Sequence, residues 1–136
     1  MTSRLNPYLN FSTEAREAMG FYKSVLGGEL TIMSFAQGGM PHAPADADLV
    51  MHAQLETPLG FTLMASDMPR EMGKPSPNGT VSLSGDDAAE LRSYWTALSA
   101  DGEVVMPLES APWGDAFGML TDRFGVQWMV NIAGRT

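Results

Sequence analysis

The sequence contains no cysteine, few basic residues and no long apolar run, and each of these absences narrows the possible functions. Without cysteine there are no disulfides, thiolate metal ligands or cysteine nucleophiles. Eight basic against 16 acidic residues give a net charge of -8, which argues against a nucleic-acid partner, because a phosphate backbone requires a basic surface. No stretch approaches the ~20 apolar residues of a membrane-spanning helix, so we expect no membrane partner. Residues 1–7 lack an apolar signal core, and we therefore expect a cytoplasmic protein.

The second half of the sequence repeats the plan of the first. A strand, an amphipathic helix and a second strand are predicted over residues 8–30, and the same order over 81–104, with Phe21-Tyr22 and Tyr94-Trp95 at matching helix positions. Two further strand-like segments follow each unit, which predicts two tandem βαβββ modules. Each half is too short to bury a large core alone, so we expect a single domain over residues 1–136. Its parts are module one at 1–67, a linker at 68–78 and module two at 79–136.

Hydrophobic periodicity and turn residues predict the individual elements. Module one has expected strands at 5–11, 29–36, 48–56 and 60–66, a helix capped by Ser12 or Thr13, and a loop at 37–47. Module two has expected strands at 79–84, 103–108, 116–121 and 126–132, and a helix that Asp87 and Glu90 begin as a capping box. The helix residues expected to be buried are Ala15, Ala18, Met19, Tyr22, Val25 and Leu26 in module one, and Ala88, Leu91, Tyr94, Trp95 and Leu98 in module two.

Three short motifs carry a family resemblance. Residues 21–27 (FYKSVLG) and 121–128 (TDRFGVQW, with Arg123 where proline is usual) are similar to the first helix and the closing turn of the vicinal oxygen chelate superfamily. Trp113-Gly114 followed by 117–122 (FGMLTD) resembles its PhnB-like subgroup. The superfamily includes glyoxalase I, bleomycin-resistance proteins, fosfomycin-resistance enzymes and extradiol dioxygenases. The resemblance covers nearly the whole chain and implies an α+β fold, in which two cupped mixed sheets enclose a metal and a substrate.

The resemblance also implies where metal ligands would lie. Members use histidine and glutamate in the first and last strand of each module. Carried over residue by residue, these positions are Pro7 and Met64 in module one, and Thr80 and Met129 in module two. None offers a carboxylate or imidazole, and a thioether is a poor ligand for a hard divalent cation. We therefore expect no metal at the usual site and no other cofactor.

Two histidines remain for a relocated metal or for proton transfer. His52 lies in the third predicted strand, where it shares one strand face with Glu56, and His42 lies in the 37–47 loop. Neither belongs to a helical pair of metal ligands. His52 is therefore a metal ligand, a pocket residue of another kind or a structural histidine, and we favour the pocket residue.

Other residues are candidates for contact with a ligand. Methionine is frequent, with 11 residues, and a methionine-lined cup fits an apolar or aromatic molecule, although core filling is the simpler interpretation. Trp113 stands in a Pro-Trp-Gly turn, where it either closes over a ligand or packs on the rim of the core. Asp67 is expected to cap the linker. The expected ligand-binding residues are Tyr8, Asn10, His52, Met64, Thr80, Trp113, Phe117 and Met129.

Two functions follow from these observations. The first is a PhnB-like protein of the glyoxalase and bleomycin-resistance type that binds a small hydrophobic or aromatic molecule without the usual metal. The alternative is an enzyme (a lyase, isomerase or dioxygenase-like) with a displaced metal or a metal-free acid–base mechanism at His52. The sequence shows no nucleophile elbow and no nucleotide- or methyl-donor-binding signature. Because members commonly pair, we also expect a homodimer.

Overall fold

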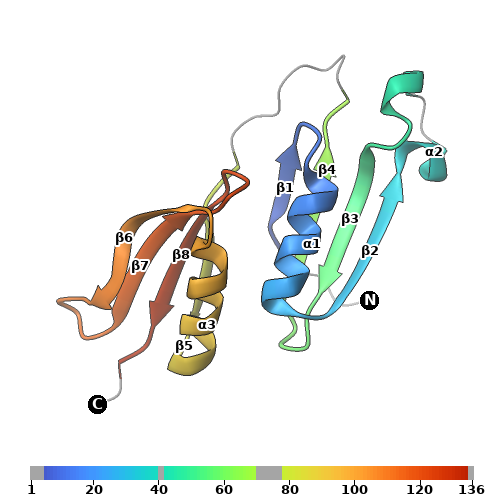
Figure 1. Ribbon diagram of the computed structural model, residues 1–136. Coiled ribbons are helices and arrows are strands. Elements are labelled where there is room, and N and C mark those ends of the chain that lie inside the picture. The colour runs from blue at the N-terminus through green and yellow to red at the C-terminus, as the bar shows by residue number, and fades with distance from the viewer. Residues whose placement is uncertain (1–4, 40–41, 70–77, 135–136) are drawn as a thin grey trace. The chain divides into compact units, whose positions relative to one another are not determined.

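The computed structural model describes residues 5–39, 42–69 and 78–134 and has the predicted α+β architecture (Figure 1). The chain divides into two compact units, residues 1–77 and 78–136, each with one four-stranded sheet. Residues 70–77 of the predicted linker and residues 40–41 of the predicted 37–47 loop lie outside the described residues. Across the part of the chain that is described, no helix has the length and apolar character needed to span a bilayer.

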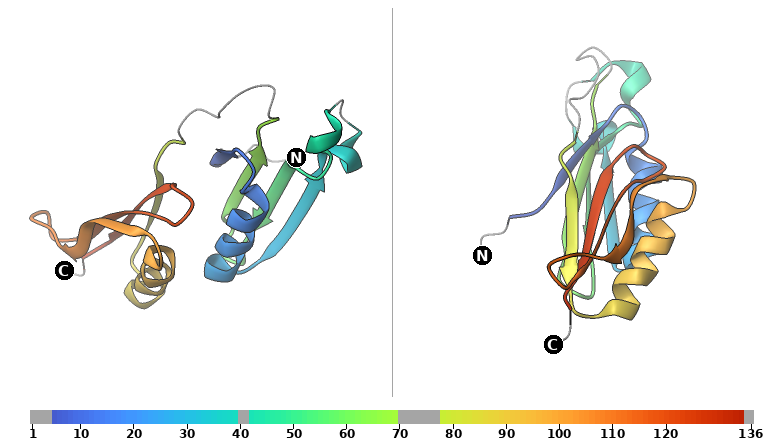
Figure 2. Two further views of the ribbon diagram at one scale, coloured as in Figure 1. Left: turned by 45° about the horizontal axis from the view of Figure 1, so that its top comes forward. Right: turned by 90° about the vertical axis from the view of Figure 1, so that its left-hand side faces the viewer.

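The first unit follows the predicted βαβββ order. Its strands pair in the order β1-β4-β3-β2, with β1 and β4 parallel and the other neighbours antiparallel. Helix α1 contacts β2, β3 and β4 and lies along one face of the sheet (Figures 1 and 2). The elements are β1 (Tyr8–Phe11), α1 (Ala15–Leu26), β2 (Glu29–Ser34), α2 (Phe35–Gly38), the 3₁₀ turn η1 (Pro44–Asp46), β3 (Val50–Glu56) and β4 (Thr62–Asp67).

The second unit has the same topology. Its strands pair in the order β5-β8-β7-β6, again with the first pair parallel and the others antiparallel. Helix α3 contacts β5, β7 and β8. The elements are β5 (Val81–Gly85), α3 (Ala88–Ser99), β6 (Glu103–Ser110), β7 (Ala116–Thr121) and β8 (Gln127–Ile132). The predicted tandem βαβββ modules are therefore confirmed.

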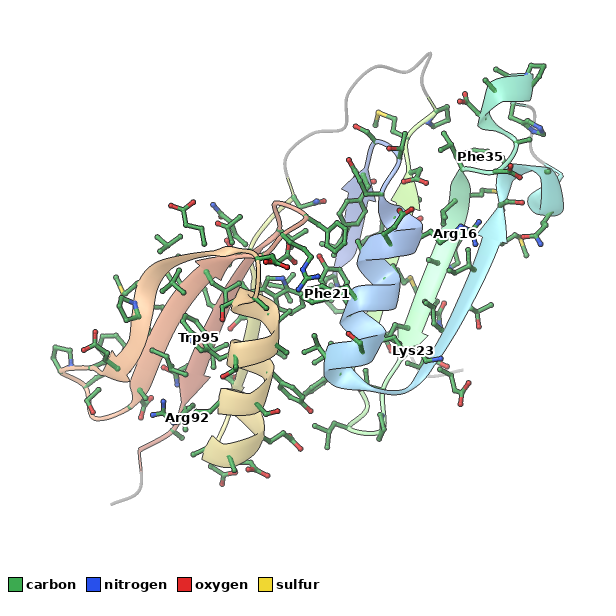
Figure 3. All side chains as sticks on the ribbon, viewed as in Figure 1. Arg16, Phe21, Lys23, Phe35, Arg92 and Trp95 are labelled. Atoms are coloured by element: carbon green, nitrogen blue, oxygen red, sulfur yellow. The ribbon has the colours of Figure 1, made fainter. Side chains whose placement is uncertain are left out.

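The buried residues of the two units repeat at a spacing of 72 positions. Three buried residues of α1 match three buried residues of α3 at this spacing: Met19 with Leu91, Tyr22 with Tyr94, and Leu26 with Leu98. The buried strand residues Leu9 and Phe11 match Val81 and Leu83 at the same spacing. The expected match of Tyr22 with Trp95 is therefore wrong by one residue. The position equivalent to the half-buried Trp95 is the exposed Lys23 (Figure 3).

The cap of α1 differs from the prediction. Neither Ser12 nor Thr13 caps the helix. Instead, the carboxylate of Asp67 accepts hydrogen bonds from the backbone N–H of Ala15 (2.9 Å) and of Val50 (2.9 Å). The parallel pairing of β1 with β4 aligns Phe11 with Asp67 and so brings the end of β4 to the start of α1. Asp67 thus caps a helix 52 residues earlier in the chain rather than the linker.

Burial raises the pKa of Asp67 above its ordinary value, and the two backbone hydrogen bonds oppose this rise only in part. Glu14 and Glu17 add repulsion that raises the pKa further. The carboxylate therefore holds three elements together at an electrostatic cost.

A second buried carboxylate organises the turn between β7 and β8. Asp122 accepts hydrogen bonds from the backbone N–H of Phe124 (2.8 Å) and of Val126 (3.0 Å) through Oδ1. Its Oδ2 accepts a hydrogen bond from the indole Nε1 of the buried Trp128 (2.9 Å). This carboxylate is the reason that the predicted 122–125 turn carries aspartate at its first position.

The remaining differences from the predicted elements are local. Strand β2 ends at Ser34 rather than at residue 36, because Ser34 and Gln37 form a capping box that begins α2. The predicted 37–47 loop therefore contains the end of α2 and η1. The cap of α3 by Asp87 is confirmed, since its carboxylate accepts a hydrogen bond from Glu90 N (3.1 Å). In the helices, Val25 is only half-buried and Ala88 is exposed.

Candidate functional site

Six of the eight candidate residues lie on the face of a sheet that is turned away from its helix, here called the far face. Along β1, β3 and β4, buried residues such as Leu9, Ala53 and Ala65 alternate with half-buried or exposed ones. Because successive side chains of a strand point to opposite faces, the residues between them lie on the far face of the first sheet. Strands β5, β7 and β8 of the second sheet follow the same rule.

One row of the first far face runs across all four strands. Tyr8 of β1 is in register with Met64 of β4, Met64 with Gln54 of β3, and Gln54 with Thr31 of β2. Partners in a register lie on the same face. The row therefore places a phenol, a thioether, an amide and a hydroxyl side by side.

Polar side chains form a chain across this face from β1 to the end of β3. The Tyr8 hydroxyl lies 3.5 Å from Nδ1 of His52, and the two rings are 6.0 Å apart. Nε2 of His52 lies 3.4 Å from Oε1 of Gln54, whose Nε2 donates to Oε1 of Glu56 at 3.3 Å. His52 is thus linked on both sides to other side chains of the far face.

The same face has further polar and apolar neighbours. Asn10 follows Tyr8 on the same side of β1 and is in register with Ser66. Met33 of β2, which is 41% exposed, is in register with His52. The histidine therefore stands between a thioether and a phenol.

The far face of the second sheet carries a row of three methionines. Met106 of β6, Met119 of β7 and Met129 of β8 are successive register partners, and Ser82 of β5 completes the row. Met106 is 48% exposed, and Met119 and Met129 are half-buried. Three adjacent thioethers make an apolar and deformable strip.

An aromatic pair and an amide lie beside this methionine row. Phe117 of β7 is in register with Asn131 of β8. The ring of Trp113, from the turn before β7, meets Phe117 edge-on at 5.7 Å. Trp113 is 62% exposed, so it does not pack into the core of its unit.

Asp115 holds this part of the face in position. Its carboxylate accepts hydrogen bonds from Nδ2 of Asn131 (3.0 Å) and from the backbone N–H of Gly134 (2.8 Å). The hydrogen bond from Asn131 is the main cause of a lowered pKa of Asp115, with smaller contributions from Gly134 and the Trp113 side chain. The amide of Asn131 is therefore oriented with its nitrogen toward Asp115.

The eight residues expected to contact a ligand fall into two groups of four. The far face of the first sheet holds Tyr8, Asn10, His52 and Met64, while Phe117, Met129 and the turn residue Trp113 belong to the second unit. Thr80 directly precedes β5, and its hydroxyl donates to Oε1 of Gln127 (3.2 Å). Sequence reasoning missed Asp115 and Asn131. Asn131 could have been found from the sequence, because it is a polar residue in a largely apolar strand, two positions after Met129 and so on the same side.

The donor groups at the superfamily's metal positions do not fit a divalent cation. The register places Tyr8, rather than Pro7, in the row of Met64, while Pro7 offers only a carbonyl that accepts from Met64 N (3.2 Å). Thioethers, a phenol and the hydroxyl of Thr80 are poor partners for a hard cation. Within residues 5–39, 42–69 and 78–134, no three histidine, aspartate or glutamate residues gather in a cluster able to hold a metal.

Comparison with known proteins settles the family. The sequence profile of the glyoxalase/bleomycin resistance protein/dioxygenase superfamily matches residues 4–130, and the chain belongs to this superfamily. The resemblance seen in the sequence motifs is thereby confirmed.

Individual relatives agree with this assignment. Protein YjdN of Escherichia coli (strain K12) is 30% identical, with 94% of each chain covered. The crystal structure of protein PA1353 from Pseudomonas aeruginosa is 38% identical, covers 98% of this chain and all of its own, and superposes with a TM-score of 0.85. A PhnB protein from Bacillus cereus is 27% identical, covers 96% of this chain and all of its own, and has a TM-score of 0.74.

Proposed function

We propose that this protein binds a small hydrophobic or aromatic molecule on the far face of a sheet without the metal used by metalloenzymes of the superfamily. The row of Met106, Met119 and Met129 carries this proposal. Methionine adapts its shape to irregular apolar partners and interacts favourably with aromatic rings. At the metal positions the chain likewise has Met64 and Met129 in place of imidazole and carboxylate.

The aromatic pair beside the row supports the same proposal. An exposed indole that meets Phe117 edge-on provides a flat apolar surface beside the methionine row. Binding sites of this kind combine an apolar lining with a few fixed polar groups that orient the ligand. Asn131, held by Asp115, is such a group in the second unit.

A charge in the middle of the methionine row tests the proposal. Titration of 2-naphthol, followed by tryptophan fluorescence, measures binding by the intact chain. Met129→Glu should weaken this binding about tenfold or more, a loss of about 1.4 kcal/mol, because the apolar strip would have to desolvate a carboxylate.

Leu59→Glu is the matched control. Leu59 is 51% exposed and belongs to the turn between β3 and β4, so this variant adds the same charge in the other unit and outside the sheet that carries the row. It should bind 2-naphthol as the wild type does. Equal affinities of wild type and Met129→Glu, with both folded by circular dichroism, would contradict the proposal.

A second candidate function is acid–base catalysis at His52, which the polar chain favours. The imidazole is within 3.5 Å of the Tyr8 hydroxyl, and histidine is the usual group for proton transfer near neutral pH. In this case His52→Ala should abolish turnover of a substrate found by screening while leaving its affinity largely intact. Equal loss of binding, with no turnover by the wild type, would favour the binding protein instead.

We also propose a homodimer. Strand β6 is at the edge of the second sheet, and Val104, Val105 and Met106 along it are 45%, 59% and 48% exposed. An apolar edge strand is prone to pair with another chain unless it is covered. Sedimentation at the mass of one 14.7 kDa chain would rule out a stable dimer.

A further inference from the structure

The polar chain on the far face of the first sheet has a direction, because it ends in a carboxylate. A carboxylate only accepts hydrogen bonds, so the amide of Gln54 must turn its nitrogen toward Glu56. The amide oxygen of Gln54 then faces Nε2 of His52, and this oxygen also only accepts. Nε2 of His52 must therefore carry the proton of that contact.

The same elimination extends to Tyr8. A neutral imidazole protonated at Nε2 has a lone pair at Nδ1, which can only accept a hydrogen bond. The Tyr8 hydroxyl, 3.5 Å from Nδ1, is then the donor in their contact. Its own oxygen keeps lone pairs that point away from His52, and Tyr8 is 46% exposed.

We propose that Glu56, acting through Gln54, selects the tautomer of neutral His52 that carries its proton at Nε2, so that the Tyr8 oxygen accepts a hydrogen bond from a hydroxyl or amine of a molecule bound on the far face of the first sheet. Glu56 and Gln54 are positioning residues in this arrangement, and Tyr8 contacts the ligand. The ligand part of this inference rests on the proposed binding function, whereas the direction of the chain does not.

Two carboxylates at the Glu56 end of the polar chain favour the same class of ligand. Glu29 of β2 is the register partner of Glu56, so two carboxylates face each other across neighbouring strands of this sheet. An anionic group brought to this part of the face would meet repulsion from both. The expected ligand is therefore an apolar molecule with a neutral or cationic hydrogen-bond donor, rather than a carboxylate or a phosphate.

Nitrogen chemical shifts of the histidine rings test the direction of the hydrogen bonds in the polar chain. Histidine labelled with ¹⁵N distinguishes the two neutral forms, measured at a pH where the imidazole is uncharged. His52 and His42 are the only two histidines, so His42→Gln assigns the signals. In the wild type we expect His52 to carry its proton at Nε2. Protonation at Nδ1 would overturn the proposal.

Reversing the charge at residue 56 should reverse the direction of the hydrogen bonds in the polar chain. In Glu56→Lys the ammonium donates to the amide oxygen of Gln54, so the amide turns and presents its nitrogen to His52. The major population of His52 should then shift to protonation at Nδ1. Glu29→Lys makes the same charge change on the neighbouring strand and should leave His52 unchanged. Equal shifts in the two variants would show a general effect of charge and overturn the proposal.

Two probes of similar size test the ligand class. Benzyl alcohol should bind about tenfold more tightly than benzoate, and Tyr8→Phe should reduce that preference. Equal affinities for the two probes would overturn the assignment of a donor ligand. If neither probe nor 2-naphthol binds, the proposed binding function is wrong and the ligand class is wrong with it. If Glu56→Lys and Glu29→Lys nevertheless behave as expected, the proposed direction of the hydrogen bonds is still supported.

Discussion

The two units share one topology and one set of buried positions, but their far faces are different. Toward the helices, apolar residues recur 72 positions apart, as Leu9 and Val81 or Tyr22 and Tyr94 show. On the far faces, the first sheet has a polar chain centred on His52, and the second has a row of methionines around Met119.

This difference shows which residues are constrained by the packing of the helix on the sheet. A residue between helix and sheet must fill a packed space, so its size and polarity are restricted in both units. A far-face residue of the same strand is not restricted by that packing and is available for ligand contacts. Changes toward the helices should therefore reduce stability, and changes on the far faces should alter binding.

The largest effect is expected from Asp122→Ala in the second unit. The substitution leaves the buried Trp128 indole N–H and the Val126 N–H without their acceptor, at about 1–3 kcal/mol for each unpaired group. Urea unfolding should show a loss of roughly 3–5 kcal/mol. Asp122→Asn, which keeps an oxygen for the backbone donors, should lose less. A midpoint equal to that of the wild type would contradict this account of the turn.

A smaller loss of stability is expected at Trp95, the position of α3 where α1 has Lys23. Trp95 lies on Gly118 of β7, where an added Cβ would come within 2.7 Å of the indole and 2.8 Å of the Leu108 backbone. Gly118→Ala should therefore destabilise the protein by about 1–3 kcal/mol.

Gly20→Ala is the control for Gly118→Ala and should change stability in the opposite direction. Gly20 is an exposed residue inside α1, and an added Cβ there meets nothing within 4 Å. Alanine should raise the free energy of unfolding by about 0.5–1 kcal/mol, because glycine loses more backbone freedom in a helix. Equal changes in the free energy of unfolding for the two substitutions would show that the Trp95 side chain moves aside without destabilising the protein.

The smallest effects concern the pH dependence of stability in acid. The pKa of Asp67 is raised in the folded protein, so its contribution to stability is present below the unfolded pKa and is lost as pH rises through the folded pKa. The pKa of Asp115 is lowered, so its contribution is present above the unfolded pKa and is lost as pH falls through the folded pKa.

Asparagine variants separate these two contributions. The stability of the wild type relative to Asp67→Asn should decrease as pH rises, and relative to Asp115→Asn it should decrease as pH falls. Thermal unfolding at a series of acidic pH values measures both slopes. Slopes of the same sign would contradict the assignment of opposite pKa shifts to the two units.

The alternation of apolar and polar residues in the sequence determined the order of the elements, the two modules and the side of each strand that is buried. It indicated that His52 points away from the buried side of its strand, because side-chain direction in a strand follows the two-residue period. The motif at 121–128 indicated the family, and the absence of imidazole and carboxylate at the metal positions was visible from the sequence as well.

Only the tertiary structure decided which distant residues meet. Parallel pairing of β1 with β4 makes Asp67 the cap of α1, and no local signal connects these two segments. The match of Tyr22 with Tyr94, the row of Met106, Met119 and Met129, and the bond from Asn131 to Asp115 likewise depend on strand register and helix packing. Register shifts by single residues exchange one face for the other, and the pairing of strands distant in the chain, rather than local composition, selects among them.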